Sequence, residues 1–395
     1  MTFPIDLDTL VRRIHAAPVG IVLAITGGGS RAVAELLERP GGSRVLVEAI
    51  VPYSAAALVD FLATTPEQFC SARTARLMAM AAYQRALRLA SAGPESADLD
   101  ALQKDSAIVG IACTASLASD RPKRGDHRVH VAYQTQGTTA EYSLVLTKDR
   151  RNRIEEENVA TSLILNALSH ACGKLGELNL DTVESIDERR AEADEAQQEL
   201  LHGGRRQVQV GRVPIIATGQ RRAVFPGAFN PLHDGHREMA RIARERLGQP
   251  VEFEISIHNV DKPPLDYLEM RDRVEQFKDG ETLWLTRAPT FEEKSRIFPD
   301  ATFIVGADTI ARIADPVYYD GNQQAMLAAI DRIASRGGRF LVFGRSGDSV
   351  HGFQALETLD LPSALLAICT EVSESEFRAD VSSTQLRRDQ SNLNR

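Results

Sequence analysis

The sequence predicts an α/β protein of two domains, the second of which is a doubly wound parallel sheet. Its 395 residues exceed what one ordinary hydrophobic core accommodates, so two domains are expected. Short apolar runs typical of strands alternate with helix-like runs along both halves, and this alternation predicts layered α/β domains. In the second half it calls for parallel strands whose carboxyl-terminal ends meet at one ligand-binding edge.

Composition restricts the classes of function. Hydrophobic residues make up 43% of the chain and charged residues 25%, which is typical of a globular protein in water. The formal net charge of -8 argues against a nucleic-acid partner but is compatible with a local basic pocket for a phosphorylated small molecule. The cysteines lack metal-binding spacing, and no apolar run or basic leader indicates a membrane or secretion. We therefore expect a cytoplasmic protein.

The first half reads as one α/β domain over residues 1–175. We expect helices over 7–16, 31–38, 72–90 and 154–171, and strands over 20–25, 45–51, 107–113, 129–133 and 142–147. A capping box at residues 65–68, Thr-Pro-Glu-Gln, predicts a helix start at that point. Gly27, Gly28 and Gly29 follow the first strand, and this turn either cradles a phosphate or is a tight turn without a ligand.

Residues 176–213 are expected to form a charged, solvent-exposed helical linker. Acidic and basic residues dominate from 181 to 202, whereas apolar positions are too few for a well-buried helix face. Gly203 and Gly204 end this segment. The domain boundary therefore falls here, and the second domain is expected over residues 214–395.

One stretch of the second half carries the functional argument. It is residues 227–236, Gly-Ala-Phe-Asn-Pro-Leu-His-Asp-Gly-His, between a strand-like run at 222–225 and a helix-like run at 237–247. Backbone N–H groups and the dipole at the start of such a helix form a site for anions such as phosphate. His233 and His236 would add side chains to this site.

The rest of the second half offers further cations and hydroxyl groups. We expect strands over 251–257, 282–286, 301–305, 339–343 and 365–372, and helices over 267–277 and 322–336. Lys262, after the first of these strands, is the best further cation for a phosphate, whereas Arg271 and Arg273 are expected on the solvated face of their helix. At 381–387, Val-Ser-Ser-Thr-Gln-Leu-Arg places hydroxyls and an arginine at another helix start.

The motifs at 233–236 and 381–387 resemble the His-x-Gly-His and Ile-Ser-Ser-Thr-x-Ile-Arg elements of the nucleotidyltransferase superfamily of adenylyl- and cytidylyltransferases. Within it, residues 227–231, Lys262 and the turn at 306–308 look like the nicotinate/nicotinamide mononucleotide adenylyltransferases, and the resemblance covers about residues 220–390. It implies a Rossmann-like domain, with His233, His236, Lys262 and Arg387 as catalytic residues and with Gly227, Phe229, Asn230, Gly235, Gly306, Asp308, Ser382, Ser383 and Thr384 as nucleotide-binding residues. It also implies ATP as substrate, with a Mg²⁺ ion held mainly by ATP oxygens and water, so no cluster of protein ligands is expected.

The first half, over about residues 7–173, resembles the C-terminal domain of the competence/damage-inducible (CinA) family, whose active members are nicotinamide mononucleotide deamidases. Residues 24–28, Ala-Ile-Thr-Gly-Gly, correspond to the family's Ser-Cys-Thr-Gly-Gly turn, and Tyr53-Ser54 to its Tyr-Ser pair. Ala24 thus replaces the nucleophilic serine, and a methyl group cannot attack an amide. We expect a domain without deamidase chemistry unless Ser30 is a shifted substitute, while nucleotide binding and a scaffold role in a homo-oligomer stay open.

Three hypotheses for the function follow. The leading one is an ATP-dependent adenylyltransferase that acts on nicotinamide or nicotinate mononucleotide and releases pyrophosphate, in NAD biosynthesis or salvage. The second keeps nucleotidyl transfer but changes the acceptor to phosphopantetheine, or uses CTP with an alcohol phosphate. The third is a nucleotide-binding regulator without catalysis. The intact His233, His236 and Arg387 favour an enzyme, whose partner is a small mononucleotide rather than a nucleic acid or a membrane.

Overall fold

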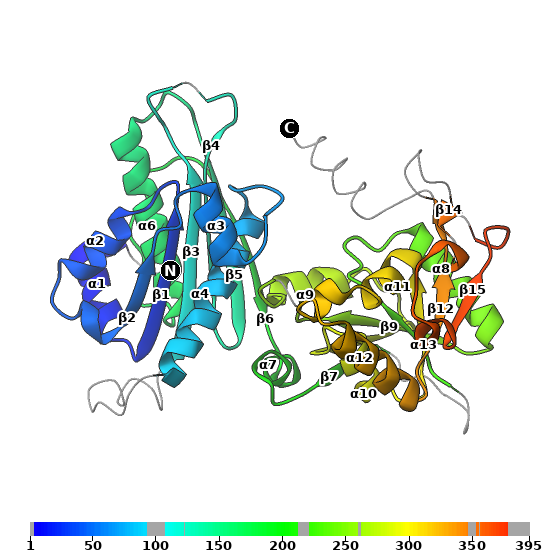
Figure 1. Ribbon diagram of the computed structural model, residues 1–395. Helices are drawn as coiled ribbons and strands as arrows, with labels where there is room; N and C mark the ends of the chain where they lie inside the picture. The colour runs from blue at the N-terminus through cyan, green and yellow to red at the C-terminus, as the bar shows by residue number, and fades with distance from the viewer. Residues whose placement is uncertain are drawn as a thin grey trace. The chain divides into compact units, whose positions relative to one another are not determined.

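The computed structural model describes residues 4–92, 107–121, 123–211, 221–259, 262–346, 353–354 and 356–377 (Figure 1). The chain divides into two compact units. The first unit consists of Met1–Gln198 and Asp261–Glu269, and the second of Glu199–Val260 and Met270–Arg395. A short segment from the second half of the sequence is therefore built into the first unit.

A mixed sheet forms the centre of the first unit, with the strand order β2-β1-β3-β4-β5-β6. β1 pairs in parallel with β2 and β3, whereas the neighbours from β3 to β6 are antiparallel. The strands are β1 (Val19–Thr26), β2 (Leu46–Ile50), β3 (Ala107–Ser116), β4 (His127–Gln134), β5 (Thr138–Leu146) and β6 (Ile186–Glu192). The layered α/β prediction for this half is confirmed.

Two apolar clusters lie on opposite faces of this sheet, because successive side chains of a strand alternate between its faces. Ile21 and Leu23 of β1 belong to the cluster that also contains side chains of α1, α2 and α6, whereas Val22 and Ala24 belong to the cluster with α3 and α4. The helices are α1 (Leu7–Ala16), α2 (Arg31–Leu37), α3 (Ala55–Leu62), α4 (Ala72–Ala92) and α6 (Arg153–Ala171), with a 3-10 turn at Gly42–Arg44. Helices therefore cover both faces (Figure 1).

The helix start expected at residues 65–68 is wrong. α3 precedes this segment and ends where Ala63 adopts a left-handed conformation, with φ of 52°. α4 begins only at Ala72, because the hydroxyl of Ser71 accepts a hydrogen bond from the N–H of Thr74 at 3.2 Å and so caps the helix. Ser71 therefore caps the helix in place of the segment at 65–68, and it lies closer to the long apolar run that forms the buried face of α4.

The structure also differs from the helical linker expected over 176–213. β6 pairs antiparallel with β5 as the outer strand of the first sheet, α7 (Glu195–His202) follows it, and β7 (Gln207–Gly211) already belongs to the second sheet. An edge strand can carry many charged residues, since one side of its backbone and much of its surface face water. Arg189 of β6, for example, pairs with Glu141 of β5 at 3.3 Å. Charge density alone therefore did not distinguish an edge strand from an exposed helix.

The second unit is built on a doubly wound sheet with the order β15-β12-β11-β8-β9-β10-β7, as predicted. The pairs from β15 to β10 are parallel, and β7 joins β10 as an antiparallel edge. The strands are β8 (Ala223–Pro226), β9 (Val251–Ser256), β10 (Thr282–Thr286), β11 (Thr302–Gly306), β12 (Arg339–Phe343) and β15 (Cys369–Val372), with a small hairpin of β13 (Arg345–Ser346) and β14 (Phe353–Gln354).

The helices of the second unit follow the strands in alternation. They are α8 (Asp234–Leu247), α9 (Tyr267–Val274), α10 (Phe291–Ile297), α11 (Ala307–Ile313), α12 (Gln323–Ser335) and α13 (Ser363–Leu366), with 3-10 turns at Pro316–Tyr319 and Leu356–Thr358. Of these, α9 begins with residues that belong to the first unit and ends with residues of the second. Within the described residues, no helix combines the length and apolarity needed to cross a bilayer.

Candidate functional site

The strand order reverses between β8 and β11, and the loop that contains His233 follows β8 at this reversal. After β8 the chain moves outward through β9 and β10, and after β11 it moves the other way through β12 and β15. β8 and β11 are adjacent and parallel, with Ala223 opposite Thr302 and Val224 opposite Phe303. The loop after Pro226 and the turn at Gly306 therefore leave the same edge of the sheet, at the position where doubly wound folds bind their ligands.

Gly227 and Phe229 shape the loop that follows β8. The N–H of Gly227 donates to the carbonyl of Glu254 at 2.9 Å, and a Cβ at Gly227 would lie 2.5 Å from the ring of Phe229. Phe229 is left-handed, with φ of 43°, and its side chain is 1% exposed. Its ring meets Phe225, Phe253 and Phe277 edge-on, with centroids 5.3–5.6 Å apart. The ring of Phe229, expected at the nucleotide, thus lies in the core and supports the loop from below.

His233 and His236 stack on each other at the start of α8. Their ring centroids are 3.8 Å apart and their planes differ by 27°, while the ring of Phe229 meets His236 edge-on at 5.1 Å. The backbone N–H of His233 lies 3.3 Å from Nδ1 of His236, which accepts it, so the ring proton of a neutral His236 is on Nε2. Burial, with the neighbouring His233 as a second cause, lowers the pKa of His236 to about 3. His236 is therefore a neutral hydrogen-bond donor at pH 7.

The end of α9 and the residues just after it hold the same loop through its backbone. Arg273 donates from Nη1 to the carbonyl of Ala228 at 3.1 Å. The side-chain amide of Gln276 donates to the carbonyl of Phe229 at 3.0 Å and accepts from the N–H of Leu232 at 2.7 Å. Arg273 is only 8% exposed, so its expected place on a solvated helix face is wrong. Sequence reasoning missed both residues, because their partners are main-chain groups that leave no side-chain signature.

The remaining described candidates of the second unit lie in this loop, in the first turn of α8 and where β11 passes into α11. Asn230 precedes a cis peptide bond to Pro231, and Gly235 lies in the first turn of α8. Gly306 ends β11, and a Cβ there would meet no atom of the described residues within 4 Å, so packing among those residues does not require a glycine at this position. Asp308 lies in the first turn of α11, half-buried. The topology thus brings the ends of β8 and β11 together as predicted, while the ligand-binding roles of these residues remain predictions.

The other cationic and hydroxyl candidates lie elsewhere in the chain. Lys262 is exposed and belongs to the segment Asp261–Glu269 of the first unit. Ser382, Ser383, Thr384 and Arg387 lie outside the described residues. Within the described ranges, no group of three or more His, Cys, Asp or Glu residues is placed to hold a metal ion. ATP and an accompanying Mg²⁺ ion remain predictions.

In the first unit, the position that resembles a nucleophilic serine is part of the core. Ala24 is 0% exposed and lies in the same apolar cluster as Leu58 and Met78. The hydroxyl of Ser30 donates to the carboxylate of Glu157 at 3.0 Å, and the N–H of Arg31 points to the same oxygen at 3.3 Å. This arrangement ties the start of α2 to α6.

The glycine turn after β1 has a packing explanation. Gly27 has φ of 78°, and a Cβ there would lie 1.9 Å from the carbonyl oxygen of Ala115. A Cβ at Gly29 would lie 2.3 Å from Ile164. Close packing of this turn against β3 and α6 accounts for these glycines, which favours the tight turn without a ligand over the phosphate cradle.

Comparison with known proteins identifies the class of the second half. Residues 224–389 match the family model described as cytidylyltransferase-like. The C-terminal half therefore contains a cytidylyltransferase-like domain of the nucleotidyltransferase superfamily, and this supports nucleotidyl transfer as its general activity. A comparison with curated proteins finds no match.

Solved structures of the CinA superfamily match the N-terminal region. A CinA superfamily protein from Escherichia coli is 15% identical with a TM-score of 0.31, and the match covers 42% of this chain and 90% of that one. The competence/damage-inducible protein CihA from Agrobacterium tumefaciens is 22% identical with a TM-score of 0.32, covering 43% and 96%. A CinA superfamily protein from Enterobacter cloacae is 16% identical with a TM-score of 0.32, covering 43% and 90%.

Proposed function

We propose that the protein transfers the adenylyl group of ATP to nicotinamide or nicotinate mononucleotide and releases pyrophosphate. The observation that carries this proposal is the cytidylyltransferase-like sequence at 224–389 together with the loop at 227–236, which follows β8 at the reversal of strand order. In such a reaction a phosphate oxygen of the mononucleotide attacks the α-phosphorus of ATP. One P–O bond forms, the bond between the α-phosphorus and the bridging oxygen breaks, and pyrophosphate leaves with the electron pair.

The residues around the loop suit the charge that develops in this step. Phosphoryl-type transfer depends mainly on positioning and on donors directed at the phosphate oxygens. Neutral His236 offers an Nε2–H donor, and the N–H groups of Asp234 and Gly235 precede the first hydrogen bonds of α8, which run from His236 and Arg237 to the carbonyl of His233. Lys262, Arg387 and the hydroxyls at 382–384 would add charge and further donors. Mg²⁺ bound to ATP would neutralise part of the triphosphate charge.

The choice of acceptor is supported by two resemblances, that of residues 227–231 to mononucleotide adenylyltransferases and that of the first half to a family acting on the same mononucleotide. Phosphopantetheine, or an alcohol phosphate with CTP, is the alternative within the same reaction class. A nucleotide-binding regulator is the alternative outside it. Intact His233 and His236 at the loop favour catalysis over regulation.

An activity screen of the full chain separates these alternatives. We expect pyrophosphate release when ATP and Mg²⁺ are combined with nicotinamide or nicotinate mononucleotide, and formation of the corresponding dinucleotide by chromatography. Phosphopantetheine with ATP, and glycerol phosphate with CTP, serve as comparison pairs. Turnover with only one of the comparison pairs would show that the acceptor is not a pyridine mononucleotide. No turnover with any pair would favour a nucleotide-binding regulator without catalysis.

We infer, in addition, that the first unit does not deamidate nicotinamide mononucleotide. Ala24 lies in an apolar cluster, and the hydroxyl of Ser30 is bonded to Glu157. Incubating the full chain with nicotinamide mononucleotide should therefore release ammonia no faster than a blank without protein. Ammonia release well above the blank that disappears in Ser30→Ala would show that Ser30 has taken over as nucleophile.

A further inference from the structure

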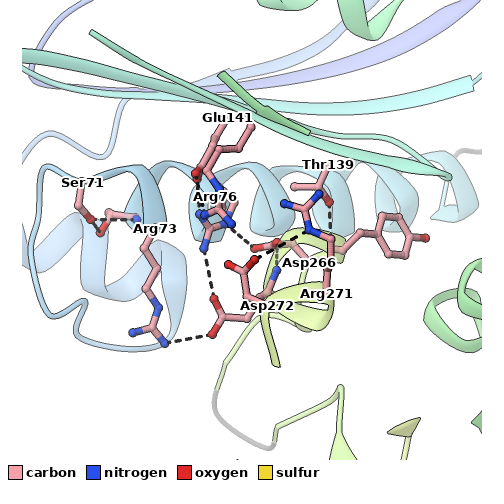
Figure 2. A network of polar contacts seen from close by, with 12 residues as sticks. Ser71, Arg73, Arg76, Thr139, Glu141, Asp266, Arg271 and Asp272 are labelled. Atoms are coloured by element: carbon pink, nitrogen blue, oxygen red, sulfur yellow. Dashed lines mark hydrogen bonds and ion pairs between the residues drawn. The ribbon is translucent and has the colours of Figure 1, made fainter. Parts of the chain in front are cut away.

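Arginine side chains that bind two or more acceptors join separate elements within each unit. In the first unit, Arg76 of α4 binds three carboxylates, among them that of Asp266 at 3.0 Å (Figure 2). In the second unit, Arg237 of α8 donates from Nη1 to the carboxylate of Glu281 at 2.6 Å and from Nη2 to the carbonyl of Gln276 at 3.0 Å. A planar guanidinium suits such paired contacts, because its N–H donors point in fixed directions. Every residue of the second cluster belongs to the second unit.

Gln276 connects this arginine to the loop of the two histidines. Its side-chain amide accepts from the N–H of Leu232 at 2.7 Å, and its main-chain carbonyl accepts from Arg237 at 3.0 Å. Leu232 and Arg237 are thus bound to the same residue. His233 and His236 lie between them in the chain, so both ends of the segment that contains the histidines have a common attachment point.

The carboxylate of Glu281 is fixed by its own turn. It accepts from the N–H of Lys278 at 2.7 Å, and the N–H of Glu281 donates to the carbonyl of Lys278 at 3.1 Å. The chain then enters β10, where Thr282 lies opposite Glu252 of β9 in the parallel ladder. The group that binds Arg237 is therefore attached directly to the central sheet of the second unit.

The ion pair between Arg237 and Glu281 acts through its direction more than through its strength. The two side chains are 30% and 25% exposed, and water weakens an ion pair of this kind. The hydrogen bonds are charge-assisted, however, and their donors belong to one rigid plane. They therefore orient the first turn of α8 against the turn before β10.

We propose that Arg237 is a positioning residue for nucleotidyl transfer: by binding Gln276 and Glu281 together, it holds the first turn of α8, and with it His236, in place above the sheet edge. This inference rests on the proposed function of the second unit. A donor displaced by about 1 Å loses as much as about 100-fold in rate, because it no longer meets the phosphate oxygens at the transition state.

The test uses the full chain with Arg237→Gln, which removes the charge and leaves one amide where the guanidinium bound two acceptors. We expect amide hydrogen exchange of residues 227–236 to become about 10-fold faster. We expect kcat for nucleotidyl transfer to fall about 10-fold, while KM for ATP changes less than about 3-fold. Arg237→Lys should stay within about 3-fold of wild type in both measurements, because an ammonium group can still donate to a carboxylate and a carbonyl.

Glu281→Gln separates positioning from a direct contact between Arg237 and a phosphate. This variant keeps the arginine but removes the charge that directs it, so exchange of 227–236 and kcat should change in the same direction as in Arg237→Gln, by about 3-fold. If Arg237 acted on a phosphate directly and had no positioning role, exchange of the loop would stay at the wild-type value in both variants. Circular dichroism checks the fold, and Glu281→Gln decides the question if Arg237→Gln does not fold.

The matched control is Arg241→Gln, one turn further along α8. Its guanidinium pairs with Glu238 at 2.7 Å and Glu245 at 2.6 Å, and the side chain is 53% exposed. The control removes the same charge from the same helix and should leave exchange of 227–236 and kcat at wild-type values.

Two results would overturn the positioning role. One is wild-type exchange of 227–236 in a folded Arg237→Gln, and the other is a change of the same size in Arg241→Gln, which would assign the effect to helix charge alone. If wild type has no transferase activity, the proposed function fails on its own, and the exchange measurement still decides whether Arg237 holds the loop.

Discussion

Replacing His236 with alanine is expected to reduce kcat for nucleotidyl transfer by about 10²–10³-fold while leaving the fold intact. The neutral ring donates from Nε2, because Nδ1 accepts the N–H of His233 at 3.3 Å. In the proposed reaction, alanine removes this donor at the place where charge builds on the phosphate oxygens. Steady-state kinetics with ATP and the acceptor found in the activity screen measures the effect, and circular dichroism checks the fold.

His236→Gln is the matched variant, because its amide N–H₂ can reach the place of Nε2 and should retain more activity than alanine. With a pKa of about 3, His236 stays neutral above about pH 5, so its titration should not shape the rate between pH 5 and 8. Wild-type activity in His236→Ala would contradict the donor role. A loss of rate on acidification near pH 6.5 that vanishes in His236→Gln would contradict the neutral state.

The sequence was most informative where apolar runs have clear ends. β10 and β12 occupy residues 282–286 and 339–343, as expected, because strand-like apolar runs between polar or glycine residues leave little freedom of assignment. The strand expected at 365–372 begins only at Cys369, since Ser363–Leu366 form α13 directly after Pro362. A proline favours the start of a helix, and the apolar run continued across that boundary without a visible break.

The sequence predicted those parts of the candidate site whose side chains can donate hydrogen bonds to a phosphate. The histidines at 233 and 236 revealed the loop, and the alternation of strands and helices placed it at a strand end, where the structure has it. The support beneath the loop was not predictable. Arg273 and Gln276 bind carbonyl and N–H groups, and Phe229, whose backbone is left-handed, turns its ring into the core. Such contacts depend on tertiary packing and leave no pattern in one sequence.

Phe229 should be the residue of the loop whose truncation destabilises the second unit most. Phe229→Ala is expected to lower the free energy of unfolding by about 3–5 kcal/mol, since a fully buried aromatic ring is lost and a cavity remains between Phe225, Phe253 and Phe277. Urea unfolding followed by Trp284 fluorescence measures the loss. A change within about 0.5 kcal/mol of wild type would show that the ring is not packed as described.

Glycine at the same position distinguishes the packing of the ring from the strain of the backbone. In a left-handed conformation alanine is disfavoured by about 1–2 kcal/mol relative to glycine, so Phe229→Gly should be more stable than Phe229→Ala. The control pair is Phe303→Ala and Phe303→Gly in β11, where the ring is also buried but the backbone is an extended strand. There glycine should be less stable than alanine by about 0.5–1 kcal/mol. If glycine is the more stable variant at 229 and the less stable one at 303, the backbone at Phe229 carries the strain of a left-handed conformation. If glycine is the less stable variant at both positions, the left-handed conformation of Phe229 is contradicted.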